Sequence, residues 1–234
     1  METENTIVEC VFDILFESDS VAESFLSTIA KVDEFECITK LPLYQVPEAI
    51  RKNDPNLKTQ PLYEITSKRN TNYKITLGDN VIGIAINNNY TSWTNSLFPQ
   101  IKKLFQEILN SGKINNITRM GLRYVDFLEN ENIFETGKIK VKIDSNESND
   151  KTMFLRIEDF VKTIQYNKVI TNKTQYGTTG KTGSIIDIIT FIDKDIPAIE
   201  NIESVFSKIN DLHNINKEKF KEVIGDEYIT EYGI

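Results

Sequence analysis

The hydrophobic pattern at the start of the chain predicts a strand followed by a helix. Residues 7–16 (IVECVFDILF) are rich in β-branched and aromatic side chains and lie between polar positions, as in a largely buried strand. Ser20 and Glu23 then have the spacing of a helix capping box, and apolar residues follow at helical intervals up to Val32. Prolines interrupt residues 41–61, which predicts a loop with at most a short helix.

The following segments predict a hairpin, a second helix and another strand. Residues 73–77 and 81–86 flank a Gly-Asp-Asn turn, which favours a β-hairpin. Ser96 is a candidate cap for a helix whose apolar stripe covers residues 101–109. Residues 118–128 (TRMGLRYVDFL) return to a strand pattern. The predicted order β-α-β-β-α-β is that of a ferredoxin-like unit.

The second half predicts further strands and a closing helix. Strand segments are expected at residues 153–157, 161–176 and 185–192, the last as a central strand because it is almost entirely apolar. Residues 138–143 alternate Lys with apolar side chains, which is typical of an edge strand. A helical pattern runs from residue 199 to residue 224.

These patterns predict an α+β fold with a mostly antiparallel sheet. The N-terminal half is expected to be ferredoxin-like, and the C-terminal half to be rich in strands and closed by a long helix. We predict a β-α-β-β-α-β lobe at residues 1–130 and antiparallel strands with the C-terminal helix at residues 131–234. One compact domain is the alternative for a chain of 234 residues.

Composition narrows the range of partners. The chain has 35 acidic and 27 basic residues and thus a net charge of −8, which argues against binding nucleic acid or anionic lipid through an extended basic surface. Cys10 and Cys37 form no Cys-x-x-Cys pair, so they favour reduced thiols over a zinc site or a disulfide scaffold. The acidic start and the lack of a long apolar run predict a cytoplasmic protein that does not enter the membrane.

Three segments carry a resemblance to a known family. They are Leu77-Gly78-Asp79-Asn80-Val81, the pair Tyr90 and Trp93, and residues 117–125 (ITRMGLRYV). Together they resemble a sporadically distributed, uncharacterised family of bacterial proteins with an Arg-x-Gly-Leu-Arg-Tyr strand. The resemblance implies a bacterial protein without an assigned activity, cofactor or catalytic residue, and its patchy distribution is compatible with defence loci. Asp126 stands where the resemblance leads us to expect Asn.

The strand at residues 118–128 carries the main candidate for chemistry. Arg119, Gly121 and Arg123 share one face because strand side chains alternate, and the glycine leaves room between two guanidinium groups. With Tyr124 and Trp93 they form a candidate anion-binding site, since each Arg fork suits a carboxylate or phosphate. The alternative is that both arginines pair with carboxylates of this acidic chain and that Gly121 accommodates a neighbouring side chain. Asp187 interrupts an apolar run, so it is either a residue of a solvated face or a buried carboxylate, and if it is buried Arg119 or Arg123 is its natural partner.

Other motifs have a structural interpretation beside each functional one. Tyr90 and Trp93 either line a pocket or anchor a helix to the sheet. The single histidine, His213, excludes sites that need two, and it is either packed and hydrogen-bonded or a general base. Residues 177–183 (GTTGKTG) lack the glycine spacing of a phosphate-binding loop and favour a hairpin.

Two functions follow from these patterns. The first is a non-enzymatic binding or assembly protein that joins a protein partner or a second copy of itself, because no complete catalytic constellation is recognisable and no cofactor or metal motif is expected. The second is a small-molecule or nucleotide binder, or an enzyme, that uses Arg119, Arg123, Tyr124 and Trp93.

Overall fold

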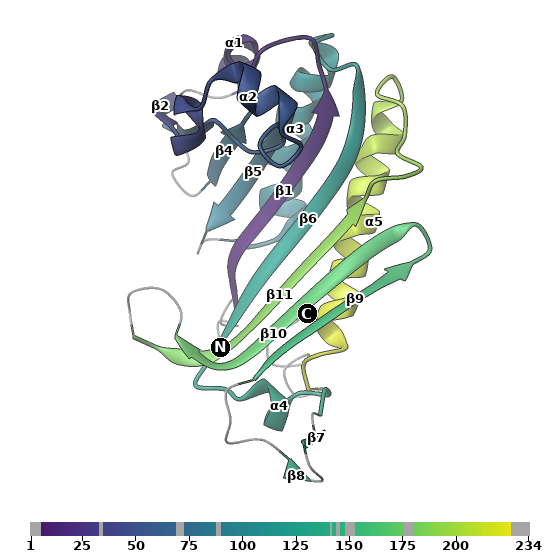
Figure 1. Ribbon diagram of the computed structural model, residues 1–234. Coiled ribbons are helices and arrows are strands. Elements are labelled where there is room, and N and C mark those ends of the chain that lie inside the picture. Colours follow the sequence, from purple (N-terminus) through teal and green to yellow (C-terminus); the bar gives the residue numbers. More distant parts are fainter. Residues whose placement is uncertain are drawn as a thin grey trace. The chain divides into compact units, whose positions relative to one another are not determined.

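The structure, a computed structural model, describes residues 6–32, 35–68, 73–87, 90–140, 142–143, 146–147, 153–175 and 180–225. Helices and strands are mixed along the chain (Figure 1). The helices are α1 Glu23–Val32, α2 Glu48–Asn53, α3 Phe98–Asn110, α4 Ile133–Thr136 and α5 Ile202–Lys221, with a 3-10 turn at Pro42–Gln45 and a π-helical turn at Trp93–Leu97. The strands are β1 Ile7–Glu17, β2 Phe35–Lys40, β3 Tyr63–Ser67, β4 Tyr73–Leu77, β5 Val81–Asn87, β6 Asn116–Glu129, β7 Lys142–Ile143, β8 Asn146–Glu147, β9 Phe154–Val161, β10 Ile164–Gln175 and β11 Thr182–Ile192.

The described strands form one large, mostly antiparallel sheet and one small one. The large sheet has nine strands in the order β2-β3-β4-β5-β1-β6-β11-β10-β9, and β7 pairs with β8. Antiparallel registers join β2 to β3, β3 to β4, β4 to β5, β9 to β10 and β10 to β11. This sheet, together with the long C-terminal helix, confirms the predicted α+β class.

The order β4-β5-β1-β6 within this sheet contains the predicted β-α-β-β-α-β unit. Two strands, β2 and β3, were not predicted, and they extend the sheet beyond β4. The predicted edge strand at residues 138–143 is wrong for the part that is described, where only Lys142–Ile143 is a strand and the edges of the large sheet are β2 and β9. Val141 lies outside the described residues.

The chain separates into two compact units that do not follow chain order. One comprises residues 1–10, 122–191 and 211–234, and we call it the β9 unit. The other comprises residues 11–121 and 192–210, and we call it the α1 unit. The predicted lobes at residues 1–130 and 131–234, by contrast, are continuous segments.

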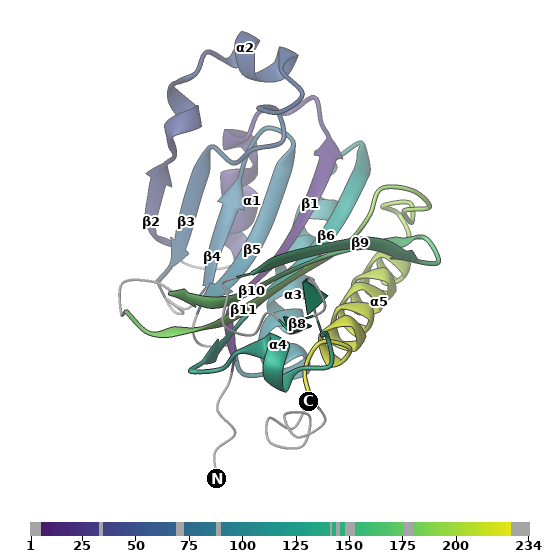
Figure 2. The ribbon, with the colours of Figure 1, turned by 60° about the horizontal axis from the view of Figure 1, so that its bottom comes forward.

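In the α1 unit, helices cover one face of the strands. Phe12 and Phe16 of β1 lie on the buried face, where the ring of Phe12 meets Phe105 of α3 at 5.0 Å and the ring of Phe16 meets Phe25 of α1 at 5.5 Å. Figure 2 shows α1 behind the strands of this unit. The alternation of strand side chains therefore divides β1 into a covered face and a second, half-buried face.

The β9 unit has the same division. Its core cluster joins α4 and the end of α5 to the strands, through Leu128, Ile133, Phe134, Ile170, Ile186, Ile188, Phe220, Val223 and Ile224. Asn216 of α5 donates to the carbonyl of Ile188 at 2.8 Å, which holds the helix on this covered face. On the opposite face, alternate residues of β11, Ile185 to Phe191, are only half-buried, and we call this the open face.

Candidate functional site

Arg119 of the α1 unit is paired with a carboxylate of the neighbouring strand. Its Nη1 donates to Oδ1 of Asp13 at 2.9 Å. A Cβ placed on Gly121 would lie 3.0 Å from the same Nη1, so the space beside this glycine is occupied by the Arg119 side chain. Burial raises the pKa of Asp13, and the Arg119 charge opposes part of that rise.

Arg123 of the β9 unit lies between two carboxylates. Its Nε and Nη2 donate to the two oxygens of Asp187 at 2.9 and 2.8 Å, a bidentate pair, and its Nη1 donates to Oε2 of Glu9 at 3.0 Å. One positive charge thus faces two negative charges on the open face of the unit. A foreign anion at Arg123 would have to displace a bidentate carboxylate and approach a second one.

Tyr124 points to the covered face, where it contacts the only histidine. Its hydroxyl lies 3.0 Å from Nδ1 of His213. Burial, with a smaller contribution from Lys217, lowers the pKa of His213 to about 4. The imidazole is therefore neutral at pH 7 and hydrogen-bonded within the fold, which agrees with the interpretation of His213 as a packed histidine.

Trp93 holds the π-helical turn against the part of α5 that belongs to the α1 unit. Its Nε1 donates to Oδ1 of Asn210 at 2.8 Å, and its ring stacks on Phe98 at 5.1 Å. The residue is 7% exposed, which leaves little ring surface for a ligand. Ser92, not the predicted Ser96, caps this helical segment by accepting the Asn95 amide, because the π-helical turn precedes α3.

The four residues of the candidate anion site are divided between the two units and, within the β9 unit, between its two faces. Arg119 and Trp93 lie in the α1 unit, and Arg123 and Tyr124 lie in the β9 unit. Arg123 faces the open face, whereas Tyr124 contacts α5 on the covered face. Anion binding by these residues stays a prediction.

A buried carboxyl was not singled out from the sequence as a titrating group. Asp126 is 4% exposed, and its Oδ1 accepts the Thr6 hydroxyl at 2.7 Å. Burial raises the pKa of Asp126 to about 7, although the hydrogen bond from Thr6 opposes this rise. Asp126 lies four residues after Leu122 and two residues after Tyr124, so strand alternation places it on the same core-facing side of β6. This spacing is the feature of the sequence from which its burial could have been predicted.

The glycine-rich segment at residues 177–183 connects two paired strands. β10 and β11 are antiparallel down to the pair of Gln175 with Thr182, which agrees with the predicted hairpin. Residues 176–179 lie outside the described residues. Lys181 pairs with Glu129 of β6 at 2.5 Å.

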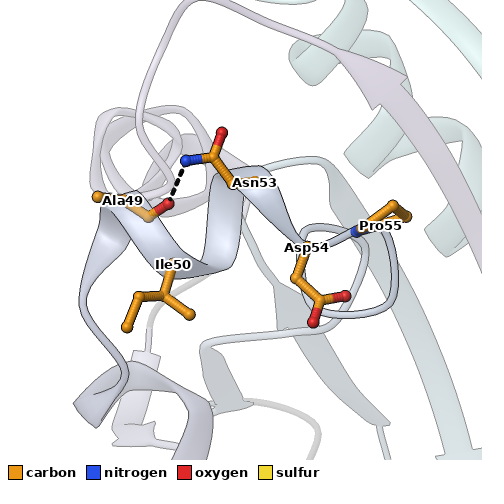
Figure 3. A pocket seen from close by; sticks show the side chains of 5 residues that line it. All are labelled: Ala49, Ile50, Asn53, Asp54 and Pro55. Atoms are coloured by element: carbon orange, nitrogen blue, oxygen red, sulfur yellow. Dashed lines mark hydrogen bonds between the residues drawn. The ribbon is translucent and has the colours of Figure 1, made fainter.

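An open depression of about 630 Å³ lies beside α2 (Figure 3). It is lined by Ala49, Ile50, Asn53, Asp54 and Pro55. The Asn53 amide bonds within the helix to the carbonyl of Ala49 at 2.8 Å, and Asp54 accepts the amide of Asn56. These polar groups serve the local backbone, so the depression shows no arrangement suited to a particular ligand.

Among the described residues of the β9 unit, the edge strand β9 carries the most exposed large apolar side chains. Phe154 is 66% and Phe160 is 61% exposed. Between them, on the same side of the strand, the exposed side chains of Arg156 and Glu158 form an ion pair with each other. Sequence reasoning located the beginning of this strand but did not recognise it as the sheet edge.

Comparison of the chain with protein-family models, with curated proteins and with solved structures gave no match. The resemblance to a bacterial family therefore stays a prediction. None of the described helices is both long enough and apolar enough to cross a membrane. Among the described residues, His, Cys, Asp and Glu form no group of three suited to a metal ion. Cys10 is buried, Cys37 is exposed, and both are free thiols.

Proposed function

We propose that this chain is a non-enzymatic binding and assembly protein of the bacterial cytoplasm that joins a protein strand along the free edge of β9. The row Phe154, Arg156, Glu158 and Phe160 carries the proposal. β9 is the last strand in the order of the described sheet, so one side of its backbone is available to another strand.

The energetics of the edge favour association. Complete burial of an exposed Phe side chain contributes roughly 1.5–3 kcal/mol, and this strand exposes two of them at its ends. Backbone hydrogen bonds from an added strand supply further affinity, and the side chains set specificity. The charged pair at the centre keeps the isolated edge soluble.

The surroundings of the arginines and of His213 also favour binding to a protein over chemistry on a small anion. The guanidinium groups of Arg119 and Arg123 are engaged by Asp13, Asp187 and Glu9. A histidine with a pKa of about 4 is a weak base at neutral pH.

Capture by purified bait protein tests the proposal. The baits are the wild-type chain, the double variant Phe154→Lys with Phe160→Lys, and the control Ile38→Lys. Ile38 is an apolar residue, 43% exposed, on β2, the edge strand at the opposite end of the sheet order, so this control separates the β9 edge from the β2 edge. We expect wild type and control to retain the same protein, either another protein or a copy of this chain, and the double variant to lose it. The binding is then repeated with both proteins purified. Equal retention by all three baits contradicts a role for the β9 edge.

A screen of nucleotides and carboxylates tests the competing function. A ligand at 100 times its dissociation constant stabilises a protein by about 2.7 kcal/mol. Stabilisation of this size that is lost on Arg123→Ala would contradict the proposal and favour the anion-binding function.

A further inference from the structure

The backbone of β9 presents alternate residues to its free edge. The amide of Asn172 in β10 donates to the carbonyl of Met153 at 3.3 Å, and the hairpin closes with Val161 opposite Ile164. Odd-numbered residues of β9 therefore direct their N–H and C=O groups toward β10. The even-numbered residues, Phe154 to Phe160, direct theirs outward. The amide of Phe160 agrees with this, because it bonds to the Asp159 side chain and not to β10.

The residues whose backbone groups face outward are Phe154, Arg156, Glu158 and Phe160. When the same row runs in the opposite direction, each Phe meets a Phe and each charged residue meets one of opposite charge. If two copies of β9 run antiparallel with Ile157 opposite Ile157, each Arg156 lies opposite Glu158 of the second copy. Each Phe154 then lies opposite Phe160 of the second copy. All four pairs join outward-facing residues, so each can exchange two backbone hydrogen bonds.

We propose that a second copy of this chain binds along β9 in this register and forms a symmetric dimer whose two-fold axis passes between the two Ile157 residues. This inference rests on the proposed function and names the partner of the same edge. Two attractive charge pairs lie at the centre of the interface and two aromatic pairs flank them. The Ile157 side chains form a closer pair on the other face of the strand, because the axis position is not hydrogen-bonded.

Neighbouring symmetric registers are less favourable. An axis at Arg156 places two guanidinium groups opposite each other, and an axis at Glu158 places two carboxylates opposite each other. Like charges directly opposite across strands are destabilising. The register at Ile157 pairs every charged and aromatic side chain of the row with a complementary one, so the sequence selects it.

Dimer formation replaces an ion pair and a hydrogen bond within one chain by equivalent interactions between the two chains. Arg156 and Glu158 change from a pair within one strand to pairs between strands. The Phe160 amide leaves Oδ1 of Asp159 for the carbonyl of Phe154 in the second copy. Because this two-fold contact uses each edge once, it ends at two copies.

Charge reversal with rescue tests the register. Arg156→Glu and Glu158→Arg are made separately and together. Lys194→Glu, on an exposed residue outside β9, is the control with the same charge change as Arg156→Glu. Association is measured by sedimentation velocity in reductant, because Cys37 is exposed. Circular dichroism checks that each variant folds.

We expect wild type, the control and the double reversal to dimerise, and each single reversal to weaken dimerisation by roughly tenfold or more, because two charge pairs become repulsive. Mixing the two single variants should restore a dimer that contains one copy of each, since every 156–158 pair is then again of opposite charge. A folded wild type that stays monomeric, or singles that are not rescued by mixing, would overturn the register. Protein capture that depends on Phe154 and Phe160 would still support the proposed function in that event, so the two failures are distinguishable.

Discussion

At the scale of single residues, the buried carboxyl of Asp126 sets a pH dependence of stability. Its folded pKa of about 7 lies above the ordinary 3.8, so the native state holds this proton more tightly than the unfolded state does. The contribution of Asp126 to the free energy of unfolding is therefore complete below the unfolded pKa of about 4 and is lost as the pH rises through the folded pKa of about 7.

Asp126→Asn should remove this loss while it keeps an acceptor for the Thr6 hydroxyl. Since three pKa units correspond to about 4 kcal/mol, we expect the variant to exceed wild type by up to about 4 kcal/mol at pH 8 and to match it near pH 4. Urea denaturation at several pH values measures the difference. A difference that does not change with pH would show that ionisation of Asp126 is not its cause.

His213 should titrate near pH 4 in the folded protein. Because burial disfavours the charged imidazole, the contribution of His213 to stability is present above about pH 6.5 and is lost as pH falls toward 4. Nuclear magnetic resonance measures this directly, because the chain has one histidine and therefore one set of imidazole signals. A midpoint near 6.5 would mean that the ring is solvated and that the contact with Tyr124 does not hold.

Residue types in the sequence limited the chemistry but did not fix which groups are buried. The pairing of Arg123 with Asp187 was one of the interpretations, because a carboxylate that interrupts an apolar run needs a cation if it is buried. Asp126 was named only as a departure from the resemblance. Its hydrogen-bond partner, Thr6, lies 120 positions away in the sequence, and such a contact is not evident from the local pattern of residues.

At the scale of elements, two strand glycines should differ in their tolerance of a side chain. A Cβ on Gly121 meets the flexible end of Arg119 at 3.0 Å, whereas a Cβ on Gly183 meets the backbone oxygen of Leu128 at 2.2 Å. We expect Gly121→Ala to cost less than about 1 kcal/mol, because the guanidinium can shift, and Gly183→Ala to cost about 2 kcal/mol or more, because strands must separate.

Chemical denaturation of both alanine variants, under the same conditions, gives the comparison. Equal losses of stability would contradict the close approach of β11 to the carbonyl of Leu128 in β6.

Elements with strong periodicity were predictable and weakly patterned ones were not. β1, β4, β5 and β6 follow their apolar runs, and α3 follows its stripe. β2 was missed because five of its residues, Glu36 to Lys40, are exposed and do not alternate, and β3 because it has only five residues after a proline-rich loop. The edge was assigned to residues 138–143 because alternating lysines are typical of edges, whereas β9 protects its edge with a central Arg–Glu pair.

At the scale of the whole molecule, the chain order of the sequence conceals its compact units. β1, β6 and α5 each contribute residues to both units, so no single boundary along the chain can separate them. Composition was informative at this scale in another way. Acidic residues outnumber basic ones, 35 to 27, and carboxylates of the chain itself engage Arg119 and Arg123.

We propose that the free edge of β9 pairs with a second strand, in the first place that of another copy. Amide hydrogen exchange at increasing protein concentration detects this pairing residue by residue. We predict that protection rises at Phe154, Arg156, Glu158 and Phe160, whose N–H groups face outward, while the intervening amides, already directed toward β10, do not change. Exchange at the four outward amides that is fast at every concentration, and unaltered by any captured protein, would contradict the claim.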